Sequence, residues 1–197
     1  MIDWIFSHWI EIFGALTGLI YIVLEIKENI WMWHVGIATS ALYVIVFFQS
    51  KFYADMALNG YYLGISVYGW YWWKYGNSNS SSPTLPITKV KTSLTLKLSL
   101  ITVLLFGILY FVLEKYTDSP VAMWDAIIAA LSITATWMLA KKILEQWIVW
   151  IFANGLATII YANKNLYPTA ILFFVYFILS IVGYYKWKKD FKTQTEN

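Results

Sequence analysis

The sequence predicts an all-α membrane protein in which seven transmembrane helices form two parallel three-helix repeats joined by one connecting helix, a 3+1+3 arrangement. Composition is the first reason, because 60% of the 197 residues are hydrophobic and only 13% are charged, against about 25% charged in soluble domains. The second is that the apolar residues fall into seven stretches close to the ~20 residues that a span needs. The third is that three of these stretches recur later in the chain.

The predicted spans follow one another with short connections, at residues 9–26, 31–49, 56–73, 94–113, 121–140, 146–163 and 166–185. The long connection, 74–93, is rich in Ser, Pro and Lys, which predicts a solvated linker. We therefore expect a first three-helix repeat (9–74), the linker with the fourth helix (75–120), a second repeat (121–188) and a cytoplasmic tail (189–197).

The repeat is visible as an ungapped shift of 114 residues. It places Lys27 on Lys141, Trp33 on Trp147 and Gly69 on Gly183. Apolar sequences match easily by chance, but matches at lysine and glycine in one register are much rarer. Three spans plus one is an even number of crossings, so both copies begin on the same side of the membrane. Parallel repeats of this kind occur in transporters, whose substrate site lies near the midplane between the repeats.

Lysine distribution predicts the orientation. With the N-terminus outside, the outer loops hold Lys51, Lys115 and Lys164, and the other eleven of the 14 lysines are cytoplasmic. Because cytoplasmic loops carry the excess of basic residues, the N-terminus is expected outside and the C-terminus inside.

Several function classes are disfavoured by the residues present. The sequence has no cysteine and no arginine, and its two histidines have no partner at metal-ligand spacing, so we expect no metal site, no cofactor and no nucleic-acid partner. No nucleotide-binding or nucleophile motif occurs, so no catalytic residue is predicted and the chain is not expected to be an enzyme. The acidic residues lie near span ends rather than centres, which favours facilitated diffusion over ion-coupled transport.

One helical face carries the strongest functional signal. Within span 146–163, polar and aromatic side chains recur every three or four residues: Trp147, Trp150, Asn154, Thr158 and Tyr161. They offer flat stacking surfaces and neutral hydrogen bonds without a fixed charge. An amide in a span also serves as glue between helices, at about 0.6 to 2 kcal/mol, so both roles of Asn154 are open.

Other spans add further candidates for the wall of a site or its gates: Ser40, Tyr43, Asn59, Tyr62 and Tyr176. Aromatic residues near span ends are expected in the interfacial belt: Trp31, Trp70, Trp72, Trp73, Tyr184, Tyr185 and Trp187. Small residues in the third and seventh spans are expected to permit close helix approach: Ser66, Gly69, Ser180 and Gly183.

Several of these motifs occur together in one known family. They are Trp33 with Gly36, the segment 51–55 (KFYAD), the end of span three at 68–73 (YGWYWW), Trp150-x-x-x-Asn154, Leu166-Tyr-x-Thr169 and Gly183-x-x-x-Trp187. Through them the sequence resembles the PnuC-type vitamin transporters over essentially its whole length.

The resemblance implies a fold like that of full-length SWEET transporters, in the bacterial inner membrane. It implies uptake of nicotinamide riboside by facilitated diffusion, after which a cytoplasmic kinase phosphorylates the vitamin and traps it. It also implies a homo-oligomer, specifically a trimer. Trp150 and Asn154 would then hold the ring and its amide. Phosphorylated forms are not expected as substrates, because no Lys lies at a span centre to neutralise a buried phosphate.

Two alternatives remain open. Asn59 stands where many nicotinamide riboside carriers of the family have Gln, and relatives called PnuT are assigned to thiamine and others to riboflavin, so thiamine is an alternative substrate. A membrane scaffold or sensor without transport is the alternative from another class.

Overall fold

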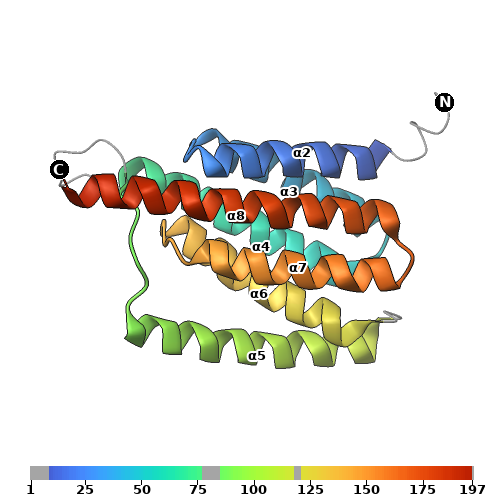
Figure 1. Ribbon diagram of the computed structural model, residues 1–197. Coiled ribbons are helices and arrows are strands. Elements are labelled where there is room, and N and C mark those ends of the chain that lie inside the picture. Colours follow the sequence, from blue (N-terminus) through green and yellow to red (C-terminus); the bar gives the residue numbers. More distant parts are fainter. Residues whose placement is uncertain (1–8, 77–84, 118–120, 197) are drawn as a thin grey trace. The chain divides into compact units, whose positions relative to one another are not determined.

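The computed structural model describes residues 9–76, 85–117 and 121–196, which form seven α-helices labelled α2 to α8 (Figure 1). Their bounds are α2 (Trp9–Ile26), α3 (Trp31–Gln49), α4 (Tyr53–Tyr75), α5 (Thr92–Tyr116), α6 (Ala122–Ala140), α7 (Gln146–Asn163) and α8 (Tyr167–Glu196). Each predicted span falls on one of these helices, so the all-helical prediction is confirmed. The main difference is that α8 continues into the sequence predicted as a tail.

Four of the described helices, α3, α5, α6 and α8, are long and apolar enough to cross a membrane by length and composition alone. The polar and aromatic residues of α4 and α7, among them Asn59 and Asn154, make those helices less apolar. Such residues are rare in lipid-facing helices and common where helices face one another or a water-filled path.

The 114-residue repeat extends to the backbone. Ile26 and Ala140, which end α2 and α6, are 114 residues apart, and so are Tyr53 and Tyr167, which begin α4 and α8. Four non-glycine residues in the described chain have positive φ, and they form two pairs with the same offset: Glu28 (52°) with Lys142 (53°), and Lys51 (62°) with Asn165 (59°). A left-handed residue ends a helix and turns the chain, so both copies use the same turns.

The chain divides into two compact units, residues 1–67 and 68–197. The division falls within α4, so the last turns of this helix pack in the second unit rather than with the first repeat. There Trp73 Nε1 donates to the carbonyl of Leu139 at 3.3 Å. The Trp73 and Trp187 ring centroids are 6.3 Å apart.

These contacts correct part of the predicted aromatic belt. Trp73 and Trp187 are buried, at 7% and 0% exposure, because their rings pack against each other and the Trp73 N–H finds a backbone acceptor. Trp31 and Tyr185 are instead exposed, as belt residues are expected to be.

In the first unit, α2 packs on α3. Trp33 is fully buried, and its ring lies edge-on to Tyr21 with centroids 6.5 Å apart. Gly36 lies against α4, because an added Cβ would lie 2.8 Å from Ser66 Oγ. A small residue on α3 therefore lets the two helices approach closely.

In the second unit, α7 packs on both α8 and α6, and α5 packs on α6. The opposite side of α5 is apolar and exposed, with Leu96, Leu100, Leu104, Ile108 and Phe111 all at least half exposed. A helix that is apolar on its exposed side is suited to contact lipid.

The linker is only partly as predicted, since residues 77–84 lie outside the described part and residues 85–90 are docked. Thr88 N–H donates to Lys142 O at 2.9 Å, and Leu144 N–H donates to Thr88 O at 2.8 Å. Lys142 Nζ donates to Leu85 O at 2.8 Å and lies 4.7 Å from the Trp73 ring centroid. Ile87 is 3% exposed. The segment 85–90 is thus a strap across the α6–α7 turn, because it carries a buried isoleucine and its backbone groups have fixed partners.

Candidate functional site

The predicted face of α7 is present, and its central residue has a defined partner on α8. Asn154 is 5% exposed, and its Nδ2 donates to Ser180 Oγ at 3.2 Å. Ser180, itself fully buried, donates to the carbonyl of Tyr176 at 2.7 Å. This bond has the geometry of helix glue, and it uses one of the two amide hydrogens of Asn154. The Oδ1 atom of Asn154 has no hydrogen-bond partner among the described residues.

Trp150 lies one turn before Asn154. Its ring is half-buried, and its indole Nε1 is buried with no acceptor among the described residues. A buried N–H without an acceptor costs about 1–3 kcal/mol. A donor without an acceptor could be satisfied by an acceptor on a bound molecule.

Trp147 differs from Trp150 in its surroundings. It is fully buried, its ring lies edge-on to Trp187 with centroids 5.7 Å apart, and an added Cβ on Gly183 would lie within 3 Å of three of its ring atoms. A side chain packed this tightly does not line an open path in this conformation. In this conformation the Trp147 ring is part of the packing between α7 and α8, and its predicted place in a substrate site stays a prediction.

The far end of the face is aromatic. Tyr161 stacks on Phe173 with centroids 5.3 Å apart, and Phe173 meets Tyr176 edge-on at 6.0 Å. Thr158 gives its hydroxyl hydrogen to the backbone carbonyl of Asn154 at 2.8 Å. Tyr161 and Tyr176 therefore belong to one aromatic cluster between α7 and α8, and Thr158 has its donor already engaged.

The first unit holds the remaining candidates. On α3, Ser40 is 6% exposed, and Tyr43 stacks on Phe47 with centroids 5.6 Å apart. On α4, Asn59 Nδ2 donates to the carbonyl of Asp55 at 2.9 Å. Tyr62 lies edge-on to Tyr61 with centroids 5.6 Å apart.

Ser180 is the residue that sequence reasoning missed, because a serine four residues after Tyr176 was assigned to helix packing. The repeat offset of 114 residues gave one signal that could have pointed to Ser180. It lies at the repeat position of Ser66, and the residue opposite changes from Ser40 in the first copy to Asn154 in the second.

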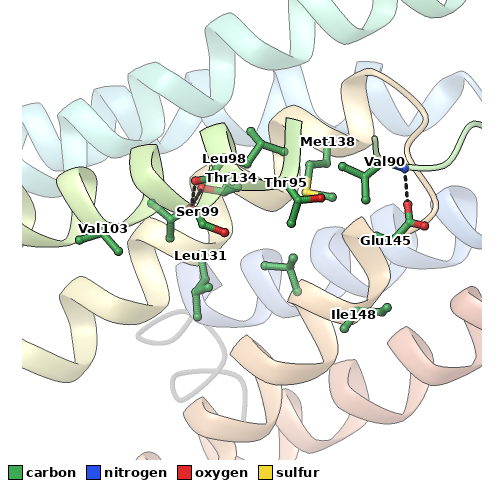
Figure 2. A pocket seen from close by; sticks show the side chains of 12 residues that line it. Val90, Thr95, Leu98, Ser99, Val103, Leu131, Thr134, Met138, Glu145 and Ile148 are labelled. Carbon is green, nitrogen blue, oxygen red and sulfur yellow. Dashed lines mark hydrogen bonds between the residues drawn. The ribbon is translucent and has the colours of Figure 1, made fainter. Parts of the chain in front are cut away.

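A cavity of about 440 Å³ lies elsewhere in the second unit, between α5, α6 and the start of α7 (Figure 2). Most of its lining is aliphatic, with Leu98, Leu131 and Met138 among its walls. Its polar groups are largely engaged: Thr102 and Thr134 share a hydrogen bond of 2.7 Å, and Glu145 accepts from the Val90 N–H at 2.9 Å. None of the predicted site residues lines it, and it offers no aromatic surface for a flat ring.

Within the described residues, no group of three or more His, Cys, Asp or Glu side chains is placed to hold a metal ion. The side chains of the α7 face themselves offer neutral hydrogen bonds and aromatic surfaces, which suit recognition of a flat polar molecule.

Comparison with known proteins finds a family of transporters. A family model described as nicotinamide mononucleotide transporter matches residues 8–189. The chain is 25% identical to the nicotinamide riboside transporter PnuC of Escherichia coli (strain K12), over 91% of this chain and 84% of that protein. It is 28% identical to the PnuC of Haemophilus influenzae, over 93% and 80%.

Two further similarities bear on substrate and fold. The riboflavin/roseoflavin transporter RibM of Streptomyces davaonensis is 22% identical over 76% of this chain and 75% of its own length. The crystal structure of the vitamin B3 transporter PnuC has the same fold, with a TM-score of 0.72 at 22% identity over 94% of this chain and 83% of that one. Because the family model covers nearly the whole sequence, this chain belongs to the nicotinamide mononucleotide transporter family, as the resemblance to PnuC-type transporters predicted.

Proposed function

We propose that the protein is a uniporter for an unphosphorylated B vitamin, and that nicotinamide riboside is its substrate. One observation carries the proposal: on one face of α7, Trp150 has a buried indole N–H without an acceptor, and Asn154 one turn later has a carbonyl oxygen without a donor. A carboxamide supplies both missing partners, since it has one acceptor and two donors. Relatives named as nicotinamide riboside transporters support the same substrate.

The face also suits the ring that bears this carboxamide. Nicotinamide riboside has a flat cationic pyridinium ring, and indole and phenol faces attract such cations by about 1–2 kcal/mol once water is excluded. Trp150 and the Tyr161–Tyr176 cluster would provide these surfaces. Ser40, Tyr43, Asn59 and Tyr62 of the first unit are proposed as further wall or gate residues.

A mononucleotide is not proposed as a substrate, although the family carries that description. In the described chain the lysines lie in turns, in the segment 85–91, in the first or last two turns of a helix, or in the last three turns of α8, as Lys74, Lys97 and Lys142 illustrate. A phosphate held between the helices would have no cation to neutralise it, and burying an uncompensated charge is prohibitive.

Transport would be passive. No carboxylate lies in the central turns of the described spans, so the usual proton or sodium relay is missing. We propose that a cytoplasmic kinase phosphorylates the vitamin and so keeps the gradient directed inward. The 3+1+3 arrangement, the N-terminus outside the bacterial inner membrane and a trimeric assembly complete the proposal.

Thiamine is the second candidate, and Asn59 favours its consideration. Its shorter side chain replaces the Gln of many nicotinamide riboside carriers, and its Nδ2 is already bonded to Asp55 O within α4. A pocket with a shorter, internally engaged amide leaves more room, which suits a two-ring vitamin.

The test uses purified full-length protein and ligand-induced thermal stabilisation, since a ligand of the folded state raises the midpoint by mass action. Nicotinamide riboside, thiamine, riboflavin and nicotinamide mononucleotide are compared at equal concentrations. We expect the riboside to raise the midpoint most and the mononucleotide to leave it unchanged.

Transport is then measured as counterflow of labelled nicotinamide riboside into proteoliposomes. A preference for thiamine in both assays would replace the substrate and keep the class. Proteoliposomes without counterflow of any vitamin would favour the scaffold or sensor and contradict the proposal.

A further inference from the structure

Ser180 sits directly behind Asn154, and the direction of its hydrogen bonds has a consequence for substrate choice. We propose that Ser180 is a positioning residue that fixes the orientation of the Asn154 amide. The amide thereby presents its carbonyl oxygen to the substrate, and the site selects a carboxamide over a carboxylate on the same ring. The inference rests on the proposed function and deepens it.

The orientation follows from counting hydrogens. A serine hydroxyl has a single hydrogen, and here Ser180 Oγ gives it to the Tyr176 carbonyl at 2.7 Å. The oxygen can then only accept. The Asn154 group that lies 3.2 Å from it must therefore be the NH2 group.

The opposite orientation of the amide would be unfavourable. It would bring Oδ1 of Asn154 against the lone pairs of Ser180 Oγ, unless the hydroxyl gave up the Tyr176 carbonyl. Because Ser180 is fully buried, no water is at hand to replace that bond. The oxygen and the NH2 group of an asparagine amide are similar in shape, and the Ser180 hydroxyl thus fixes which of them faces the serine.

The hydrogen-bonding groups that remain available to the substrate form a fixed pattern of donors and acceptors. Asn154 offers the acceptor Oδ1 and its second N–H, while Trp150 offers the donor Nε1, which has no partner among the described residues. A carboxamide places an N–H on Oδ1 and its oxygen on a donor. A carboxylate has only acceptors, so one of its oxygens would face Oδ1 without a hydrogen between them. Sites built around such a bond reject the molecule that cannot make it.

The first unit provides a matched control. Ser66 occupies the repeat position of Ser180 and is also buried, at 4% exposure. It lies against Gly36, and the position equivalent to Asn154 is Ser40, which has no amide to orient. Removing the Ser66 hydroxyl perturbs a similar buried position without touching the proposed selectivity.

The experiment measures the dissociation constants of nicotinamide riboside and of its carboxylate counterpart, nicotinic acid riboside, for the full-length protein in detergent. We expect the wild type to prefer the carboxamide by about ten-fold or more. In Ser180→Ala the amide can turn over, so the preference should fall to within about three-fold. Ser66→Ala should keep the wild-type ratio.

The outcomes separate the two claims. If Ser180→Ala keeps the wild-type ratio of the dissociation constants of nicotinic acid riboside and nicotinamide riboside, Ser180 does not set the selectivity. The proposed function then still stands. A wild type that binds neither riboside contradicts the proposed function and this inference with it. Should Ser180→Ala not fold, Ser180→Cys replaces it: its sulfur is nearly the same size but a weak acceptor, and an undiminished ratio there overturns the proposal equally.

Discussion

The two repeats use the same framework and differ on the faces that it carries. Trp33 and Trp147 are both fully buried, and Ser66 and Ser180 are buried in the same register. On the helix face one or two turns after the tryptophan, however, Gly36 in the first copy becomes Trp150 in the second, and Ser40 becomes Asn154. The buried positions are therefore shared by the two copies, and the copies differ at the exchanged positions on α3 and α7.

The largest effect is expected where the framework is tightest. In Gly183→Ala the new Cβ would overlap the ring of Trp147, and overpacking of this kind costs about 1–3 kcal/mol. The thermal unfolding midpoint of purified protein should fall clearly. Gly107→Ala on α5, where no atom lies within 4 Å of the new Cβ, is the control and should leave the midpoint unchanged or raised. Equal midpoints for both variants would mean that the α7–α8 contact is looser than described.

Substitutions of the two tryptophans of α7 should have different effects, one on affinity and the other on stability. Trp150→Phe keeps a flat ring and removes the orphaned Nε1, so affinity for nicotinamide riboside should fall by about five- to ten-fold, the worth of one hydrogen bond. Trp147→Phe opens space beside Gly183 and Trp187, so it should lower the unfolding midpoint with little change in affinity. The assignment of Trp147 to the framework is wrong if its variant loses affinity as Trp150→Phe does.

A smaller effect should distinguish two lysines that share a backbone conformation. Lys51 follows α3 and Lys142 follows α6, and both have positive φ, which favours glycine. Lys51 is exposed, so Lys51→Gly should stabilise by up to about 1 kcal/mol.

Lys142→Gly gains the same relief but loses the bond to Leu85 O and the contact with Trp73, so it should destabilise by about 1–2 kcal/mol. Urea-induced unfolding of both variants beside wild type measures the difference. Stabilisation by both substitutions would mean that the strap contributes nothing to stability.

The helices and their repeat could be predicted from the sequence alone, because both depend on local patterns. These are the length of each apolar stretch and the lysines, glycines and tryptophans that match at a constant offset. The helix ends at Ile26, Ala140, Tyr53 and Tyr167 agree with the predicted spans to within a few residues. The arrangement of the repeats as 3+1+3 and the orientation of the termini stay predictions.

Contacts between distant segments could not be predicted in the same way. The burial of Trp73 depends on Leu139 and Trp187, and the docking of residues 85–90 depends on the α6–α7 turn. Neither pairing leaves a local pattern, so an aromatic near a span end was assigned to the interface and a polar linker to solvent. The bond between Asn154 and Ser180 is of the same kind, since it joins residues 26 positions apart.

The central claim is that the exchanged residue on α7, rather than its counterpart on α3, holds the vitamin. The direct measurement is a binding titration of nicotinamide riboside with Asn154→Ala and Ser40→Ala side by side, with the unfolding midpoint recorded for each. We predict at least about a ten-fold loss of affinity for Asn154→Ala and less than about three-fold for Ser40→Ala. If Asn154→Ala keeps full affinity and only its midpoint falls, Asn154 is helix glue and the account of the site is contradicted.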